Sequence, residues 1–387
     1  MLPELIRRHC GRGIRLIDDV IKIARQFALI GNAQSAQVLG TGLIHDTYLL
    51  SSDHGGQDHH YVLQRINSRV FADPEALIAN AVRVIDHIVR KTKELVEGSA
   101  YQSLTFVRTH EGLYSYKYES GVFWRGFDYV SGTRTFNKVE TVAQAYEAAA
   151  AFGHFQALIR DLPSPRLTEV IENFHDTPAR FEQLAKAIDR DAHGRARQAA
   201  TEIATARHYH PIADELLCLH RSGLIPERIV HNDTKINNVL FDAQSGKAIC
   251  VVDLDTVMPG LSLFDFGDLV RTATMSADED EVDLSKVSMR IEIFESLVEG
   301  YLSTAGEFLN TTELDHLALC GRTITIENAV RFLTDYLEGD HYFKVARPEQ
   351  NLCRCRSQFA LAASIDRQIE EMQAIVDAAR ARSGLPG

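Results

Sequence analysis

The sequence predicts an α+β protein of two lobes, with an antiparallel sheet in the N-terminal lobe and a mainly helical C-terminal lobe. Its 387 residues exceed the length of a typical single domain. Short β-branched and aromatic segments separated by turn signals fill the chain up to about residue 130, and helical periodicity dominates after it. We therefore expect an N-terminal lobe at 1–131 and a C-terminal lobe at 132–387.

The N-terminal lobe is expected to begin with an amphipathic helix at 14–29, because Val20, Ile23 and Phe27 recur at helical spacing. Asp73 and Pro74 are expected to open a second helix, as N-cap and first helical residue, that reaches about Lys93. The predicted strands are 35–39, 46–51, 60–66, 103–109, 113–118 and 121–130.

The C-terminal lobe combines long helices with a small island of strands. The predicted helices are 138–158, 177–189, 195–222, 285–304, 311–337 and 356–382. Two apolar strands, 239–241 and 248–252, flank a turn at Gly246 within this helical lobe. Polar residues that can transfer protons or bind a metal ion lie close to these two strands in the sequence. We therefore expect the active site here.

Composition excludes several classes of protein. The net charge of −12 and the pI near 5.7 argue against a general nucleic-acid-binding surface. The first residues contain neither a signal-peptide core nor a membrane-spanning run, so we expect a cytoplasmic protein without a membrane partner. The six cysteines form no CxxC pair, which is typical of free thiols in a reducing compartment.

The segment 231–238 has the spacing H-x-D-x-K-x-x-N, which suits phosphoryl transfer. Asp233 could orient a hydroxyl acceptor and accept its proton, and the amide oxygen of Asn238 could bind Mg²⁺. Lys235, two residues after the proposed base, could reach the γ-phosphate of ATP. His231 is expected to be a buried hydrogen-bonding support for the loop.

A second acidic group follows about twenty residues later. Asp253 ends the apolar run 249–252 and is the expected second magnesium ligand, and Asp255 is expected to point the same way. Taken singly, Asp and Asn residues in loops usually make turns; together with the 231–238 loop they form a specific pattern. We interpret Asp265, in an Asp-Phe-Gly sequence, as a support that accepts N–H groups of the loop, not as a metal ligand.

The N-terminal lobe offers candidates for nucleotide binding. Gly40 and Gly42 could let backbone N–H groups approach phosphates, although a plain hairpin turn explains them equally well. Arg65 could bind the α- and β-phosphates, with Gln64 as the alternative if the strand register slips by one residue. The segment 125–130, which includes Phe127 and Tyr129, is expected to be the hinge whose backbone contacts adenine.

Five motifs together resemble the bacterial N-acetylhexosamine 1-kinases, within the aminoglycoside phosphotransferase and choline kinase superfamily. The resemblance extends from about residue 35 to residue 360, and the motifs are YVLQRIN, FHDT, HNDTKINNVLFD, VVDLDTVMPGLSLFDFGD and RFLTDYLEGDHYF. It implies a two-lobed protein-kinase-like fold and an ATP- and Mg²⁺-dependent transfer to the anomeric hydroxyl of GlcNAc or GalNAc.

The resemblance also implies roles for single residues. Asp233 would activate the anomeric hydroxyl, and Asn238 and Asp253 would hold magnesium. Arg331 and Tyr342 match positions that contact the sugar or its N-acetyl group, although without the resemblance both would be ordinary surface residues. His45 and Asp46 are further substrate candidates on the same grounds, and Asp255 is a substrate candidate because of its place beside Asp253.

Two alternatives stay open at this point. The acceptor could be another small-molecule hydroxyl, such as a different sugar, an aminoglycoside or an amino alcohol. The chain could also be a nucleotide-binding regulator without catalysis, although every group of the catalytic loop is present. The sequence specifies no oligomeric state.

Overall fold

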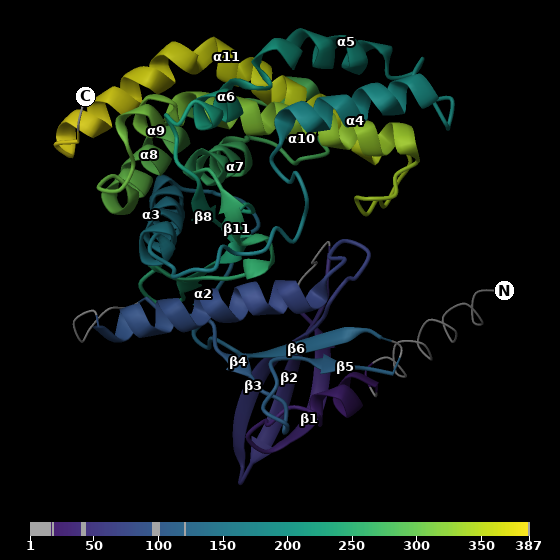
Figure 1. Cartoon of the computed structure of the whole chain (residues 1–387), viewed down its shortest axis with the longest axis vertical. Helices are drawn as coiled ribbons and strands as arrows, with labels where there is room; N and C mark the ends of the chain where they lie inside the picture. The colour runs from purple at the N-terminus through teal and green to yellow at the C-terminus, as the bar shows by residue number, and fades with distance from the viewer. Residues whose placement is uncertain (1–16, 18, 40–43, 95–100, 120, 386–387) are drawn as a thin grey trace. The chain divides into compact units, whose positions relative to one another are not determined.

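The computed structural model describes residues 17, 19–39, 44–94, 101–119 and 121–385 (Figure 1). The described residues divide into two compact units. The first contains the chain up to Val89 together with Ser103–Thr133, and the second contains the rest. The predicted fold class is confirmed, since an antiparallel sheet is followed by a mainly helical part.

All six strands predicted for the first unit are present, and every pair is antiparallel. Their spatial order is β1-β2-β3-β6-β4, and β5 also pairs with β6. The strands are β1 Asn32–Val38, β2 Asp46–His54, β3 Gln57–Arg65, β4 Phe106–Val107, β5 Tyr116–Lys117 and β6 Phe123–Asp128. β4 and β5 are shorter than predicted because the chain between them turns tightly, with Thr109 N–H donating to the Leu113 carbonyl.

One face of this sheet packs against the N-terminal helical segment. Tyr48, Leu63 and Trp124 share a core with Val20 and other residues of that segment. The helix is shorter than the predicted 14–29: residues 19–24 are helical, a turn follows at 25–26, and 14–16 lie outside the described residues. It ends there because Phe27 forms a β-bridge with Thr109.

Helix α2 (Pro74–Glu94) begins and ends as predicted. Oδ1 of Asp73 accepts hydrogen bonds from the N–H groups of Glu75 and Ala76 at 3.1 and 3.0 Å, which is the expected N-cap. Its buried face repeats at helical spacing, for example at Leu77 and Ala81.

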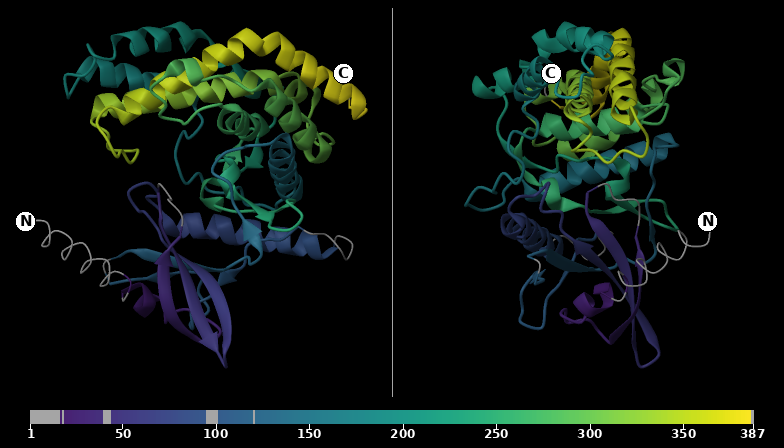
Figure 2. Two further views of the ribbon diagram at one scale, coloured as in Figure 1. Left: turned by 180° about the vertical axis from the view of Figure 1, so that it is seen from behind. Right: turned by 90° about the vertical axis from the view of Figure 1, so that its right-hand side faces the viewer.

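The second unit consists mainly of helices. They are α3 Val142–Ile159, α4 Thr177–Arg190, α5 Ala200–Tyr209, α6 Glu215–Arg221, α7 Ser262–Thr274, α8 Ile291–Ala305, α9 Thr311–Asp315, α10 Leu317–Glu338 and α11 Gln350–Arg382. The two longest, α10 and α11, pack side by side (Figure 2), and apolar side chains of α4, α5, α10 and α11 form one buried cluster.

Two segments of this unit that were predicted as continuous helices are interrupted. The segment 195–222 breaks into α5, a 3₁₀ turn and α6, because Pro211 in the turn lacks the N–H that a continuous helix needs. The segment 311–337 breaks at His316, where short α9 ends and α10 begins.

Helices α7 and α10 approach closely through two glycines. A Cβ added to Gly267 would lie 2.6 Å from the Cys320 carbonyl oxygen, and one added to Gly321 would lie 2.6 Å from a methyl group of Val270. A larger side chain would force the helices apart, and overpacking of this kind costs about 1–3 kcal/mol. The glycines therefore fix the position of α7, which carries two acidic residues described below.

We expect Gly267→Ala to lower the melting temperature of the protein by several degrees, because its methyl group would meet backbone of α10. Thermal unfolding followed by circular dichroism measures this shift. Glu295→Ala, at an exposed position on α8, serves as the control and should leave the melting temperature unchanged. An unaltered melting temperature in Gly267→Ala would mean that the helices are not in close contact.

Candidate active site

Short strands of the second unit hold the 231–238 loop at both ends. β8 (Arg228–Val230) enters the loop and pairs with β11 (Met258–Gly260). A 3₁₀ turn, Ile236–Asn238, leads out of it into β9 (Val239–Asp242), which pairs with β10 (Ala248–Val251). An antiparallel pair of strands thus holds each end of the loop, and the sequence predicts one of these pairs, β9 with β10.

Asp265, in the first turn of α7, accepts hydrogen bonds from the loop backbone. The N–H groups of His231 and Asn232 donate to its two carboxylate oxygens at 2.9 and 2.6 Å. Gln156 of α3 donates to the same carboxylate at 2.6 Å, and the Thr234 hydroxyl donates to the Asp265 carbonyl at 2.6 Å. Burial raises the pKa of Asp265, and these donors oppose that rise. This is the bracing geometry that the sequence predicts for Asp265.

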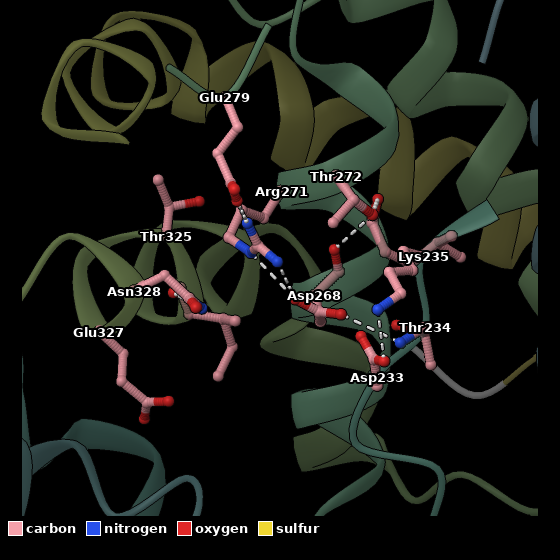
Figure 3. Close-up of polar contacts among 12 residues, drawn as sticks. Asp233, Thr234, Lys235, Asp268, Arg271, Thr272, Glu279, Thr325, Glu327 and Asn328 are labelled. Atoms are coloured by element: carbon pink, nitrogen blue, oxygen red, sulfur yellow. Dashed lines mark hydrogen bonds and ion pairs between the residues drawn. The ribbon is translucent and has the colours of Figure 1, made fainter. Parts of the chain in front are cut away.

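A second acidic residue of α7, which the sequence analysis missed, also holds the loop. Asp268 accepts from the Thr234 N–H at 3.0 Å and forms an ion pair with Arg271 at 2.8 Å. Arg271 also forms an ion pair with the partly exposed Glu279 at 3.0 Å, so these three charged side chains form a chain that begins at the loop (Figure 3). The sequence feature that could have predicted this role of Asp268 is its spacing of three residues from Asp265, which places both carboxylates on one helix face.

Asp233 lies at the centre of the loop, with a side chain 26% exposed. Lys235 Nζ lies 2.8 Å from its carboxylate, and Nδ2 of Asn238 donates to it at 3.1 Å. Burial acts to raise the pKa of Asp233, but the charge of Lys235 and the hydrogen bonds outweigh it and lower that pKa. The carboxylate is therefore ionised at neutral pH, as a proton acceptor must be.

We expect Lys235→Met to move the acidic limb of the kcat/KM profile to higher pH. A lowered pKa keeps Asp233 ionised further into the acidic range, so loss of the lysine charge lets protonation begin at a higher pH. Steady-state kinetics across pH measure this limb. Lys247→Met, which removes an exposed lysine paired with Glu147, is the control and should leave the limb in place. An unmoved limb in Lys235→Met would contradict the proposed coupling.

Backbone hydrogen bonds join the segment that carries Asn238 to the segment that carries Asp253. The Val252 N–H donates to the Asn238 carbonyl at 2.9 Å, and Nε2 of His231 lies 3.0 Å from the Val252 carbonyl. Asp253 follows directly, in a left-handed conformation with φ of 61°. His231 is fully buried here, as expected for a support of the loop.

These residues fit a magnesium ion that is shared with a nucleotide. The amide nitrogen of Asn238 donates to Asp233, which leaves its oxygen as a possible ligand. In the part of the chain that the structure describes, no group of three or more His, Cys, Asp or Glu could hold a metal. Mg²⁺ commonly takes one or two protein oxygens and completes its shell with phosphates and water, and the roles of Asn238 and Asp253 as its ligands stay predictions.

The expectation that Asp255 points the same way as Asp253 was based on strand geometry and is not supported. β10 ends at Val251, and Leu254–Thr256 forms a 3₁₀ turn after the left-handed Asp253. Residues two apart share a face only in an extended strand. Asp255 is 3% exposed, and its substrate role stays a prediction.

In the first unit, Arg65 forms an ion pair with Asp46 on the neighbouring strand, at 3.1 Å, and both side chains are about half exposed. Tyr61 and Leu63, the preceding alternate residues of β3, lie in the core beneath the N-terminal helical segment. Arg65 therefore belongs to that face of the sheet, and Gln64 to the opposite one.

Gln64 contacts an arginine that the sequence analysis had placed only within the hinge. Arg125 is 2% exposed, and its guanidinium donates twice to the Gln64 side chain, at 3.0 and 2.8 Å. It also lies 5.2 Å from the ring centre of Phe127. Arg125 is thus the buried cation on this face of the sheet. The feature that brings it to Gln64 is the pairing of two strands that are far apart in sequence.

The structure places Phe127 within the sheet, and its role as a nucleotide contact stays a prediction. Phe127 lies inside β6, with β3 on one side and β4 on the other, so a strand occupies whichever side its backbone groups face. Tyr129 follows the strand, and its N–H donates to the His60 carbonyl at 3.2 Å. Any backbone group that hydrogen-bonds the adenine ring of a nucleotide must therefore come after Asp128.

The remaining candidates of this unit are near the start of β2. Gly40 and Gly42 lie outside the described residues. His45 is 8% exposed, accepts a hydrogen bond from the Asn67 N–H at 3.0 Å and stacks on Phe71. These contacts explain its position without a ligand, so its substrate role also stays a prediction.

Arg331 and Tyr342 lie together in the second unit. The Arg331 guanidinium is 5.8 Å from the ring centre of Tyr342 and 5.0 Å from that of Phe174. Asp335 holds the backbone segment that carries Tyr342, because its carboxylate accepts hydrogen bonds from the three backbone N–H groups of 341–343. We call Phe174, Arg331 and Tyr342 the arginine-aromatic cluster.

Comparison with known proteins identifies the family. The Phosphotransferase enzyme family (APH) matches residues 35–295, which is more than half of the chain. The chain belongs to this family.

Two expectations from composition concern the cysteines and the membrane. The five cysteines in the described part of the chain are free, as predicted. None of the described helices combines the length and apolar character needed to cross a bilayer.

Solved structures support the fold. A microcompartment-associated aminopropanol kinase is 16% identical, with 92% of this chain and 98% of that chain covered and a TM-score of 0.53. Spectinomycin phosphotransferase APH(9)-Ia, solved with ADP and spectinomycin, is 12% identical with the same coverages and a TM-score of 0.60. An aminoglycoside phosphotransferase from Alicyclobacillus acidocaldarius is 13% identical, with 90% and 96% covered and a TM-score of 0.55. At these identities the likeness concerns the fold.

Proposed function

We propose that this protein is an ATP-dependent kinase that phosphorylates the anomeric hydroxyl of an N-acetylhexosamine, GlcNAc or GalNAc. The observation that carries the proposal is the constellation around Asp233, a lysine-paired ionised carboxylate on a braced loop. Phosphoryl transfer depends mainly on positioning and electrostatic stabilisation, and a rigid loop with these groups supplies both.

Each group of the loop has a proposed task. Asp233 accepts the proton of the acceptor hydroxyl, and Lys235 contacts the transferred phosphate. Asn238 and Asp253 would hold magnesium, which, when bound, neutralises charge on the β- and γ-phosphates. In the first unit, we propose Arg65, the glycines 40 and 42, and backbone near Tyr129 as nucleotide contacts.

The arginine-aromatic cluster supports a sugar acceptor over a polycationic one. Arg331 and Arg180 both lie near the buried carboxylate of Glu327, and Arg180 also donates to the Phe174 carbonyl at 2.9 Å. Both oxygens of Glu327 are already bonded to His175 and Thr177. The guanidinium groups can donate hydrogen bonds to the hydroxyl and N-acetyl oxygens of a sugar, whereas the ammonium groups of an aminoglycoside offer them no acceptor.

A panel of acceptors tests the proposal. ATP consumption should be measured with GlcNAc, GalNAc, other free sugars, an aminoglycoside and an amino alcohol, and the product examined by ³¹P NMR. We expect the highest kcat/KM with an N-acetylhexosamine and a phosphate coupled to the anomeric proton. Preference for an amino alcohol or an aminoglycoside, the substrate classes for which the similar kinases described above are named, would favour the alternative acceptor class and overturn the sugar assignment.

A further inference from the structure

The peptide group that joins Asn232 to Asp233 is contacted by a histidine ring on each side. Its carbonyl oxygen lies 3.3 Å from Nε2 of His175, and its N–H points to Nδ1 of His231, also at 3.3 Å. Asn232 has a left-handed φ of 63°, which a residue other than glycine keeps only when its surroundings hold it. The orientation of the backbone that carries Asp233 is thus set partly from outside the loop, by His175.

His175 is oriented in turn by a buried carboxylate on α10. Its Nδ1 lies 2.8 Å from one oxygen of Glu327, and the Thr177 hydroxyl donates to the other oxygen at 2.7 Å. Glu327 is 0% exposed and His175 6%. Burial acts to raise the pKa of Glu327, but His175 and the Arg331 charge outweigh it and lower that pKa. An ionised carboxylate on one ring nitrogen fixes which way the imidazole faces.

Packing restricts the same ring. Phe264 of α7 lies 5.1 Å from the His175 ring and Phe174 lies 4.7 Å from it, measured between ring centres. With aromatic rings against it and a polar group at each nitrogen, the imidazole has little freedom to turn. His175 is therefore a rigid link between α10 and the catalytic loop.

The same carboxylate also borders the arginine-aromatic cluster. Arg331 is four residues after Glu327 on α10, so both side chains lie on one face of that helix. Phe174, which lies beneath Arg331, is the chain neighbour of His175. Arg331 thus acts on Glu327 through its charge, and hydrogen bonds lead from Glu327 through His175 to the peptide group before Asp233.

We propose that His175 and Glu327 are positioning residues that hold the Asn232–Asp233 peptide group in a fixed orientation relative to Arg331. The proposal rests on the proposed function in taking Asp233 as the base. Neither residue touches a reacting atom. They act by keeping the Asp233 carboxylate in line with an acceptor held at the cluster, where a displacement of about 1 Å can cost roughly 100-fold in rate.

Two substitutions of His175 separate its two contacts. The amide nitrogen of Asn falls near the place of Nδ1, so His175→Asn keeps the Glu327 contact and loses the Asn232 carbonyl. The amide nitrogen of Gln falls near the place of Nε2, so His175→Gln keeps the carbonyl and loses Glu327. We expect kcat to fall roughly 10- to 100-fold in His175→Asn, with KM for ATP changed less than about 3-fold, and His175→Gln to recover most of the loss.

A second measurement does not depend on the acceptor. Hydrogen exchange of peptides that cover 231–234, followed by mass spectrometry, should be faster in His175→Asn than in wild type and near wild type in His175→Gln. Tyr209→Phe is the matched control, because it removes a hydrogen bond to Asp366 at 2.8 Å, within the packing of α5 and α11. It should alter neither kcat nor exchange in 231–234.

The outcomes separate this inference from the proposed function. Loss in His175→Asn with recovery in His175→Gln supports positioning. Equal losses of kcat in both variants, with a lowered melting temperature, indicate that the pair is merely structural and overturn the inference. Wild-type kcat in both variants also overturns it. If wild type phosphorylates no acceptor of the panel, the proposed function fails, and unchanged exchange of 231–234 in His175→Asn then overturns the inference independently.

Discussion

Asp233→Asn is expected to lower kcat roughly 100- to 10,000-fold while ATP affinity changes little. The amide keeps the shape of the carboxylate but cannot accept the proton of an acceptor hydroxyl, and general base catalysis contributes about that factor. The lowered pKa of Asp233 shows that the environment favours the ionised form that this substitution removes. Steady-state kinetics give kcat, and isothermal titration with a non-hydrolysable ATP analogue gives the affinity.

Asp242→Asn is the control for this variant. Asp242 ends β9 and accepts hydrogen bonds from Gln244 and Ser245 in an exposed turn, which the Asn oxygen can also accept. Activity should stay near that of wild type. Turnover within a few-fold of wild type in Asp233→Asn would remove Asp233 from the role of base.

Asp265→Asn is expected to have the second largest effect, on both stability and rate. Both carboxylate oxygens accept N–H groups, from His231 and Gln156 on one side and from Asn232 on the other. Whichever way the new amide turns, its NH₂ group faces a donor. A buried donor left without a partner costs about 1–3 kcal/mol, and the loosened loop should lower kcat roughly 10- to 100-fold.

Thermal unfolding and kcat measured on the same preparation test this prediction. Asp283→Asn, at an exposed cap that bonds Ser285, is the control and should change neither quantity by much. If Asp265→Asn kept wild-type stability and rate, the brace between α7 and the loop would be unimportant, and the close packing of α7 on α10 would have no functional consequence.

The contacts within the 231–238 loop were predictable because the residues that make them are close in sequence. Four polar residues within 231–238 and the strand end before Asp253 are close in sequence, and their convergence follows from a turn between short strands. Asp265 was also predictable, since a carboxylate at a helix start needs N–H partners. In both cases neighbouring residues determine the structure.

The supporting residues could not be predicted in the same way. His175 and Glu327 are separated by 152 residues, and Gln64 and Arg125 by 61. Such pairs leave no local pattern, because only the packed helices or the paired strands bring them together. Arg65 shows the related difficulty in a strand, where a shift of one residue exchanges the two faces of the sheet.

A crystal structure with Mg²⁺, a non-hydrolysable ATP analogue and the acceptor tests the central claim most directly. The account predicts one magnesium ion bonded to the Asn238 amide oxygen and the Asp253 carboxylate, at about 2.1 Å. It also predicts the acceptor hydroxyl within about 3 Å of the Asp233 carboxylate. A metal held by other residues, or an acceptor hydroxyl remote from Asp233, would contradict it.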